Sequence, residues 1–179
     1  MLRIAGGEHR GRKLKAVPGD TTRPTSARVR EALFSIAGPR RRVLDGFSGT
    51  GAIALEALSR GAERAVAVEK NARAVAVIEE NARLLGLEDR LRVIRGDAPG
   101  ALSALASGEF DLVFADPPYA FEDWERLMAA LARTASADGI VVVEHGVDRP
   151  SPACPSLDLL REYRYGGTAL SVYRPTSQD

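Results

Sequence analysis

Apolar and polar segments alternate along the chain between residues 43 and 144. Short, nearly continuous apolar runs predict strands, and longer segments with apolar residues three or four positions apart predict helices. The predicted strands are 43–46, 64–68, 91–94, 110–115 and 140–144, and the predicted helices are 52–59, 72–85, 101–106 and about 124–134. Nearly continuous apolar strands are typical of a sheet with helices on both faces. The alternation therefore predicts an α/β fold with a doubly wound parallel sheet.

Both ends of the chain depart from this alternation. Near the C-terminus, 159–165 and 169–173 flank Gly166-Gly167, which predicts an antiparallel β-hairpin. A sheet that ends in such a hairpin is similar to the seven-stranded, Rossmann-like sheet of class I S-adenosylmethionine-dependent methyltransferases.

The N-terminal region predicts a small extension to this sheet. Two short strands are expected at 2–5 and 12–16, joined by a glycine-rich turn. Thr25 or Ser26 is expected to cap a helix that ends before Gly38-Pro39. Its predicted apolar face consists of Val29, Ala32, Leu33 and Ile36. We therefore expect a basic hairpin-and-helix extension at 1–38 and the main domain at 39–179.

Composition narrows the class of protein. A chain of 179 residues, 45% hydrophobic and 27% charged, is typical of one globular domain. No apolar run is long enough for a membrane span and no signal peptide is apparent, so we expect a cytoplasmic protein. Cys154 has no cysteine partner and is interpreted as an incidental loop residue. His9 and His145 lack metal-ligand spacing, so no metal is expected.

Charge is unevenly distributed behind the net value of +1. Residues 1–42 hold 11 Lys and Arg against 3 Asp and Glu, whereas residues 43–179 hold 14 against 21. A basic segment joined to an acidic body suggests an arm that binds a polyanion. A solvated basic surface with no partner explains the same charges equally well.

A glycine loop follows the first predicted strand. Gly49 and Gly51 allow a tight turn and close approach of a ligand, and the next helix directs its positive end toward that ligand. Glu69 ends the second strand, 24 residues after Asp45, where a carboxylate can accept hydrogen bonds from a ribose. Dinucleotide-binding sheets share these features, although Ala54 replaces their third glycine.

The acid before the loop favours S-adenosylmethionine over a dinucleotide. Asp45 would repel a phosphate but would stabilise the ammonium group of an amino acid. A purely structural turn is the remaining interpretation. Asp97, after the third strand, is positioned either to accept from an adenine amino group or to cap a helix. The predicted cofactor-binding residues are Asp45, Phe47, Gly49, Thr50, Gly51, Glu69, Lys70, Asp97 and Ala98.

Asp116-Pro117-Pro118-Tyr119, after the fourth strand, is the most specific motif in the chain. Two prolines end a buried strand and make a rigid exit at the edge where α/β proteins bind ligands. The Asp116 carboxylate and the Pro117 carbonyl can each accept one N–H of an amino group, and Tyr119 offers a face for stacking. Two acceptors stabilise the positive charge that develops on the nitrogen during methyl transfer. All four residues are therefore predicted to be catalytic, although a turn in which Asp116 caps the next helix is a structural alternative.

Asp-Pro-Pro-Tyr resembles the motif of methyltransferases that act on the amino groups of adenine, cytosine, guanine or glutamine. The flanking segments resemble the RsmD family, the bacterial 16S ribosomal RNA guanine-N2 methyltransferases, over nearly the whole chain. The segments that carry this resemblance are Arg3 to Gly7, Gly11 to Leu14, Arg23 to Thr25, Arg28 to Phe34, Leu55 to Ala62 and Tyr165 to Ser171. Gly46 and Ser35 depart from the family pattern, which usually has a bulkier apolar residue and Asn there.

The resemblance implies S-adenosylmethionine as cofactor and a guanine of the small ribosomal subunit as substrate. It implies that Asp116, Pro117 and Tyr119 hold the base, which must leave its helix to reach them. Phe121 and Trp124 either wall this pocket or pack in the core, and core packing is the favoured interpretation. The residues predicted to contact RNA phosphates are Arg10, Arg12, Lys13, Lys15, Arg23, Arg28 and Arg30. An internal ion-pair cluster of Arg28, Arg30 and Glu31 on one helix is an alternative for these two arginines.

Other functions remain open at this stage. A DNA amino-methyltransferase usually needs a separate recognition segment, and no long insertion is present. A protein glutamine methyltransferase fits the motif, but the basic arm argues against it. A nicotinamide oxidoreductase or a non-catalytic RNA-binding module would leave Asp116-Pro-Pro-Tyr119 unexplained.

Overall fold

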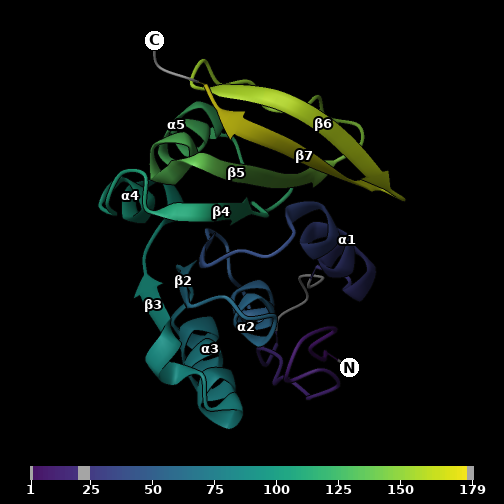
Figure 1. Ribbon diagram of the computed structural model, residues 1–179, viewed down its shortest axis with the longest axis vertical. Helices are drawn as coiled ribbons and strands as arrows, with labels where there is room; N and C mark the ends of the chain where they lie inside the picture. Colours follow the sequence, from purple (N-terminus) through teal and green to yellow (C-terminus); the bar gives the residue numbers. More distant parts are fainter. Residues whose placement is uncertain (1, 20–24, 177–179) are drawn as a thin grey trace.

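The computed structural model describes residues 2–19 and 25–176, which form an α/β fold around a seven-stranded sheet (Figure 1). The strand order is β3-β2-β1-β4-β5-β7-β6, with β1 to β5 parallel and β6 and β7 antiparallel. The strands are β1 (Arg42–Asp45), β2 (Arg64–Glu69), β3 (Leu91–Arg95), β4 (Phe110–Ala115), β5 (Ala135–Gly146), β6 (Leu157–Tyr165) and β7 (Thr168–Pro175). The helices are α1 (Ala27–Ala37), α2 (Ala52–Ser59), α3 (Ala72–Leu85), α4 (Ala98–Ser103) and α5 (Trp124–Thr134), with a short 3₁₀ turn, η1 (Glu88–Arg90). The predicted parallel sheet and C-terminal hairpin are confirmed.

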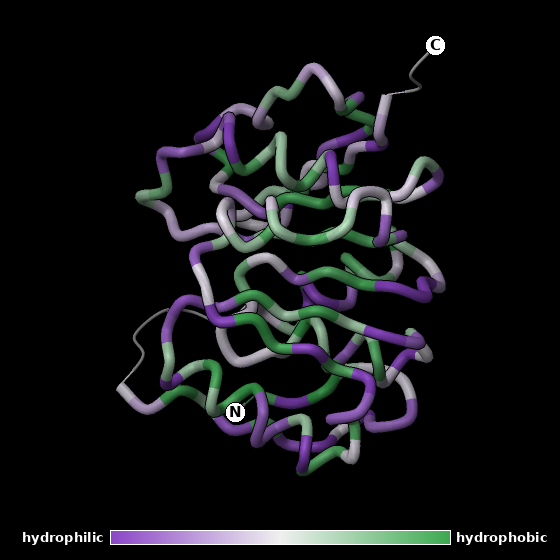
Figure 2. The backbone as a smooth tube through the Cα atoms, turned by 90° about the vertical axis from the view of Figure 1, so that its left-hand side faces the viewer, coloured by the Kyte–Doolittle hydropathy of each residue, from purple (hydrophilic) through white to green (hydrophobic). Residues whose placement is uncertain are grey.

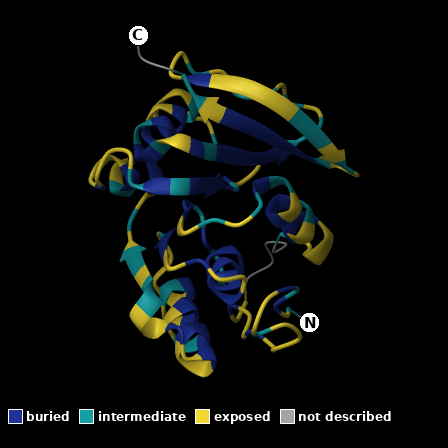
Figure 3. Ribbon diagram, viewed as in Figure 1, coloured by how far each residue is buried: buried dark blue, intermediate teal, exposed yellow. Residues whose placement is uncertain are grey.

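Two hydrophobic clusters hold the layers together, one on each face of the sheet. Alternation along β1 places Val43 in the cluster beneath α1, α2 and α3, and Leu44 in the cluster beneath α4 and α5. Hydrophobic segments run through the middle of the molecule (Figure 2), and the central strands are buried whereas the edge strand β6 is largely exposed (Figure 3). Within the described ranges, no helix has the length and hydrophobicity needed to cross a membrane.

Most element boundaries agree with the sequence pattern. Helix α1 begins after Ser26, whose hydroxyl accepts a hydrogen bond from the backbone of Val29, and it ends at Gly38. Helix α4 is an exception, because it covers 98–103 rather than 101–106. Pro99 lies in its first turn, where a proline costs no hydrogen bond. Strand β5 also exceeds its prediction, since it extends from Ala135 to Gly146.

The N-terminal strands are shorter than predicted. Only an isolated bridge between Arg3 and Lys13 remains of the two strands, although further backbone hydrogen bonds join the same two segments. The segment packs against α2, and a Cβ atom on Gly7 would lie 2.0 Å from the Ser59 carbonyl oxygen. Ile4 and Leu14 enter the cluster beneath α1, α2 and α3. This region is therefore integrated into the main core, and a domain boundary near residue 38 stays a prediction.

A buried ion pair joins this N-terminal region to the sheet domain. Arg30 on α1 is 2% exposed, and its Nε donates to Glu56 of α2 over 3.1 Å, while Glu56 is fully buried. The remaining guanidinium nitrogens of Arg30 donate to the carbonyl oxygens of Thr25 and Arg3, each at 2.7 Å. The prediction that Arg30 contacts RNA phosphates is therefore wrong, because its charge is buried and paired. Arg30 is paired with Glu56 of α2, and not within the cluster of Arg28, Arg30 and Glu31 that was the alternative prediction.

Replacing Glu56 by Ala should destabilise the fold by about 3–5 kcal/mol, because Arg30 would keep a buried charge without its counterion. Urea unfolding of the two proteins measures this difference. The control is Glu63→Ala, which removes the exposed ion pair between Arg41 and Glu63 and should change the stability little, because water screens this pair. Equal losses in the two variants would contradict the anchoring role.

Candidate active site

A row of carboxylates lies at the carboxyl edge of the parallel strands. Asp45 is in register with Ala67 on β2 and with Phe114 on β4. Side chains alternate along a strand, so Glu69 and Asp116, each two residues further along, face the same side of the sheet as Asp45. The negative charges of Asp116 and Glu69 both raise the pKa of Asp45, which agrees with their proximity.

A fourth carboxylate extends the row onto β5. Phe114 is in register with Val142, so Glu144 lies level with Asp116 on the same face of the sheet. This face is the one that α1, α2 and α3 cover, and the arrowheads of β4 and β5 point toward α1 in Figure 1. Asp45, Glu69, Asp116 and Glu144 thus border one region, at the edge where α/β proteins bind ligands.

The predicted glycine loop is held in place by Glu69. Its two carboxylate oxygens accept hydrogen bonds from the backbone of Gly49 and of Asn71, each at 2.8 Å. Gly51 has a φ of 78°, and a Cβ atom there would lie 3.0 Å from Ile78 of α3. Only glycine adopts that backbone conformation readily, so the loop can turn sharply into α2. The loop and the end of β2 therefore form one rigid unit.

The Asp45 carboxylate is buried, and the described residues provide no hydrogen bond that offsets its loss of hydration. Its side chain is 1% exposed, and neither oxygen has a hydrogen-bond partner among the described residues. Burial raises the pKa of Asp45 to about 7, and the nearby Ser48 hydroxyl and Phe47 amide offset this rise only in part. A buried acceptor without a donor is unfavourable unless a ligand completes it. The ammonium group of an amino acid is a ligand of suitable charge.

The segment Asp116-Pro117-Pro118-Tyr119, called the diproline corner below, follows β4 and leaves the sheet beside this region. Pro117 is buried, whereas Tyr119 is 76% exposed and its hydroxyl donates to Asp148 over 2.8 Å. Asp116 accepts a hydrogen bond from the Thr25 hydroxyl at 3.2 Å. Burial raises the pKa of Asp116 to about 6, and the Thr25 hydrogen bond offsets this in part. The corner thus presents a half-buried acceptor and an exposed aromatic ring.

Glu144 was not predicted from the sequence. It is 9% exposed, and its Oε2 has no hydrogen-bond partner within the described part of the chain. Burial and, to a smaller extent, the charge of Asp116 raise its pKa to about 8, although the hydroxyls of Thr25 and Thr168 act to lower it. The available signal was an acid directly after the apolar run 140–143, just as Asp45 and Asp116 directly follow the apolar residues of their strands.

The aromatic residues near the corner pack on the opposite face of the sheet. Phe47 meets Phe121 edge to face at 5.6 Å between ring centroids, and Phe121 meets Trp124 in the same way at 5.5 Å. All three rings contact the cluster beneath α4 and α5. Core packing of Phe121 and Trp124 is therefore confirmed. The contact also joins the glycine loop to the segment after the diproline corner.

The remaining predicted cofactor residues are dispersed around the same edge. Asp97 is exposed at the first turn of α4, and its side chain makes no capping hydrogen bond there. Ala98 is buried, Lys70 is exposed, and the Thr50 carbonyl accepts from Asn81 of α3. Their contact with a cofactor stays a prediction. The helix-capping alternative for Asp97 is not supported.

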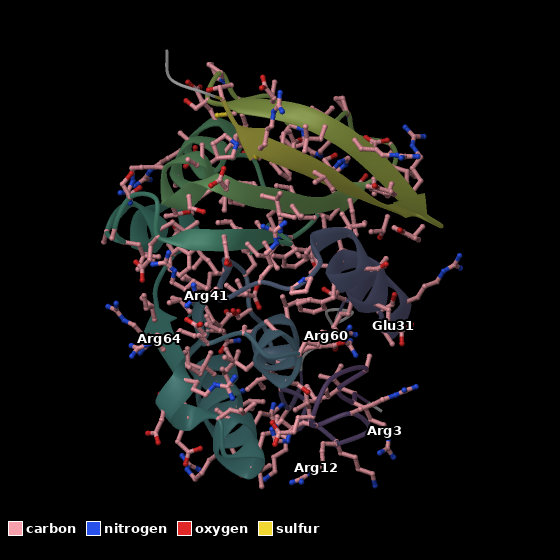
Figure 4. All side chains as sticks on the ribbon, viewed as in Figure 1. Arg3, Arg12, Glu31, Arg41, Arg60 and Arg64 are labelled. Carbon is pink, nitrogen blue, oxygen red and sulfur yellow. The ribbon has the colours of Figure 1, made fainter. Side chains whose placement is uncertain are left out.

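The predicted phosphate contacts fall into distinct environments. Arg10 and Lys13 are exposed on the N-terminal segment, and Arg28 on α1 lies over the Tyr165 ring at 5.9 Å. Arg12 donates to the Leu84 carbonyl, and Lys15 forms an ion pair with Glu80. Figure 4 shows Arg12 on the N-terminal segment, at the end of the molecule away from β6. Arg23 lies outside the described residues.

No group of three or more His, Cys, Asp or Glu side chains across residues 2–19 and 25–176 is arranged to hold a metal ion.

Gly46, which departs from the family pattern, has ordinary space for a Cβ atom, and the nearest neighbour of that atom would be the Phe114 carbonyl oxygen at 3.4 Å. Its absence of a side chain is therefore no steric requirement of the site.

Comparison with known proteins places this geometry among methyltransferases. The family described as "Conserved hypothetical protein 95" matches residues 2–174. "Putative rRNA methyltransferase YlbH" of Bacillus subtilis is 35% identical over 181 residues, covering 97% of this chain and 98% of the relative. "Ribosomal RNA small subunit methyltransferase D" of Escherichia coli K12 is 32% identical over 184 residues, covering 99% and 92%.

Solved structures are similar along the same length. The structure described as "Putative methyltransferase yhhF from Escherichia coli" has a TM-score of 0.81 and 35% identity, covering 99% of each chain. An RNA methyltransferase from Salinibacter ruber in complex with S-adenosyl-L-homocysteine has a TM-score of 0.68 at 20% identity, covering 88% of this chain and 97% of its own. The latter similarity concerns the fold alone.

The buried Asp45 carboxyl should make the free protein less stable as pH rises. The pKa of Asp45 is about 7 when folded and about 3.8 in its ordinary state, so between these values the unfolded chain binds fewer protons than the folded one. The free energy of unfolding therefore falls over this range, by at most about 4 kcal/mol for a shift of this size. Asp45→Asn should remove this contribution, giving a variant more stable than the native protein at pH 8 and similar to it at pH 4.

Chemical unfolding at several pH values measures the effect. Asp138→Asn, which changes an exposed carboxylate on β5, is the control and should keep the native pH slope. If Asp45→Asn keeps the native dependence of the unfolding free energy on pH, then burial of the ionised Asp45 carboxylate does not destabilise the protein.

Proposed function

The chain belongs to the Conserved hypothetical protein 95 family, and we propose that it transfers a methyl group from S-adenosylmethionine to the N2 amino group of a guanine in 16S ribosomal RNA. Its fold is that of class I S-adenosylmethionine-dependent methyltransferases, and the resemblance to the RsmD family is confirmed. One observation carries the proposal. The diproline corner, with its amine acceptors, lies at the same sheet edge as the unpartnered Asp45 and the glycine loop.

The residues around the glycine loop fit the cofactor. Asp45 would hold the ammonium group of the methionine part. This group supplies the positive counterion and the hydrogen-bond donors that the buried carboxylate lacks. Glu69 keeps free lone pairs for ribose hydroxyls, and its two backbone hydrogen bonds orient the carboxylate. Asp97 would accept from the adenine amino group. When bound, S-adenosylmethionine supplies an electrophilic methyl group on a sulfonium.

The diproline corner would prepare the amine. An exocyclic amine is a weak nucleophile, because its lone pair is delocalised into the ring. Acceptance of its two N–H bonds by Asp116 and by the Pro117 carbonyl favours a pyramidal nitrogen and stabilises its developing positive charge. With a pKa of about 6, Asp116 is ionised at neutral pH and basic enough to take the departing proton, directly or through water. Tyr119 would stack on the base, since its ring is exposed at the corner.

The choice of small-subunit RNA follows the relative named small subunit methyltransferase D. The choice of guanine N2 follows the resemblance of the sequence motifs to the RsmD family. The surface supports a nucleic acid partner. Arg10 and Lys13 are exposed on the N-terminal segment, and Arg28 lies beside Tyr165 at the end of β6. Because Arg30 anchors the N-terminal region to α2, these charges hold a fixed position relative to the diproline corner.

Asp116→Ala should reduce methyl transfer by at least about 100-fold, because the amine loses its charged acceptor. Binding of S-adenosylhomocysteine, measured by calorimetry, should change little, since Asp45 and Glu69 remain. Transfer is measured with labelled cofactor and small subunits from a strain that lacks the enzyme, and nucleoside analysis identifies the product. Native turnover in the variant, or a product other than N2-methylguanosine from the native protein, would count against the proposal.

Replacing Arg10, Lys13 and Arg28 together by Gln should weaken RNA binding and reduce its dependence on salt. Each lost phosphate contact lowers the slope of log affinity against log salt by about one. Substitution is preferable to truncation, because Ile4 and Leu14 belong to the core. Arg64→Gln serves as the control, since Arg64 is exposed across the molecule from α1 (Figure 4). An unchanged slope in the triple variant would exclude these residues as phosphate contacts.

A further inference from the structure

Glu144 is a buried acid to which the proposed reaction assigns no task. It is 9% exposed, its Oε2 lacks a hydrogen-bond partner in the ranges that the structure describes, and no ion pair of the described residues includes it. A buried carboxylate oxygen without a donor costs free energy, and native proteins keep such groups mostly where a ligand completes them. Its position on the sheet indicates which ligand atom that would be.

Glu144 and Asp116 flank the place where the amine must lie. Adjacent parallel strands carry them at equivalent positions, because the last register pair before them is Ala115 with Val143. The Thr25 hydroxyl donates to Asp116 and also lowers the pKa of Glu144, so it lies near both carboxyls. On its other side Glu144 is paired with Leu170 of β7, and the Thr168 hydroxyl is close to it. The two carboxyls therefore face one site from neighbouring strands.

The Watson–Crick edge of guanine presents donors that match this arrangement. Guanine carries the N2 amino group between two ring nitrogens, of which N1–H is a donor and N3, on the ribose side, is an acceptor. The ring nitrogens beside the amino groups of adenine and cytosine, N1 and N3 respectively, are acceptors instead. If Asp116 and the Pro117 carbonyl take the two N2 hydrogens and Glu144 lies on the N1 side of the amino group, this acceptor on β5 meets N1. An ionised carboxylate there attracts N1–H and repels an acceptor.

We propose that Glu144 accepts the N1–H of the target guanine and so selects guanine over bases with an acceptor beside the amino group. This inference rests on the proposed function, since it takes guanine N2 as the methylated atom. A hydrogen bond from N1–H favours the ionised form of Glu144, so base binding and loss of its proton are coupled. Sites that bind a substrate donor reject analogues that lack it by large factors, because a buried acceptor is then left unpaired.

Competition between two target bases tests this role. Small subunits are reconstituted with 16S RNA that carries either guanosine or 2-aminopurine riboside at the mapped target position. 2-Aminopurine keeps the reactive N2 amino group, but its N1 is an acceptor. The two substrates compete in one tube at pH 8.5, above the pKa of about 8 of the Glu144 carboxyl. The ratio of their kcat/KM values does not depend on the fraction of enzyme that is folded.

The native protein should prefer guanosine by at least about 100-fold. In Glu144→Gln the side-chain amide can donate to an acceptor N1, so this preference should fall at least tenfold. Glu144→Asp keeps the charge but withdraws it by one methylene, and should slow guanosine without improving 2-aminopurine. Glu162→Gln, the same chemical change on β6, should keep the native ratio. The missing O6 of 2-aminopurine affects every variant alike and cancels in the comparison.

The outcomes separate the two levels of the proposal. N2-methylguanosine from the native protein together with an unchanged ratio in Glu144→Gln would overturn the role of Glu144 and leave the proposed function intact. A native product that is not N2-methylguanosine would overturn both. A ratio that shifts equally in Glu144→Gln and Glu162→Gln would reduce Glu144 to a structural residue.

Discussion

The parallel register of β2, β1, β4 and β5 is the constraint on which the site depends. It sets Asp45, Glu69, Asp116 and Glu144 at the carboxyl ends of four adjacent strands and on one face of the sheet. Like charges brought together and shielded from water resist ionisation, and the pKa values of Asp45, Asp116 and Glu144 are all raised. Such an arrangement is unfavourable in the free protein. It becomes favourable beside a cationic cofactor and a base rich in N–H donors.

The acids differ in what they lack, and the difference suggests their roles. Glu69 accepts one backbone hydrogen bond on each carboxylate oxygen, from Gly49 and from Asn71, which orients it and leaves lone pairs for a ligand. The carboxylate oxygens of Asp45 lack a hydrogen-bond partner among the described residues, which suits a counterion for a ligand charge. The Thr25 hydroxyl lies near both Asp116 and Glu144, at the side of the site where the amine would enter. The row thus passes from cofactor to substrate along the sheet edge.

Residues 1–38 matter to this site through their anchoring. The buried Arg30–Glu56 pair attaches α1 and the N-terminal segment to α2, and the carbonyl of Thr25 accepts from the same guanidinium. Thr25 is thereby held where its hydroxyl reaches Asp116. A segment that the charge pattern suggested to be an RNA arm is also part of the wall of the site. Its basic surface and the diproline corner are consequently fixed relative to each other.

Sequence reasoning succeeded where local chemistry determines structure. Helix α3, between the Asn71 cap and Gly86, and the hairpin around Gly166 follow from periodicity and turn residues alone. The glycine loop and the diproline corner were recognisable because their residue types have few other uses. Arg30 and Glu144 were not, because their roles depend on partners distant in the chain. Arg30 is paired with a residue 26 positions away, and Glu144 acquires meaning only when strand pairing places it beside Asp116.

A crystal structure with S-adenosylmethionine bound is the most direct measurement of the central claim, which is that one sheet edge brings the donor methyl group to the diproline corner. The account predicts the ammonium group beside Asp45, the ribose on Glu69, and the methyl carbon directed toward the space between Asp116 and the Pro117 carbonyl. A cofactor bound elsewhere, or one whose methyl carbon points away from that corner, would contradict it.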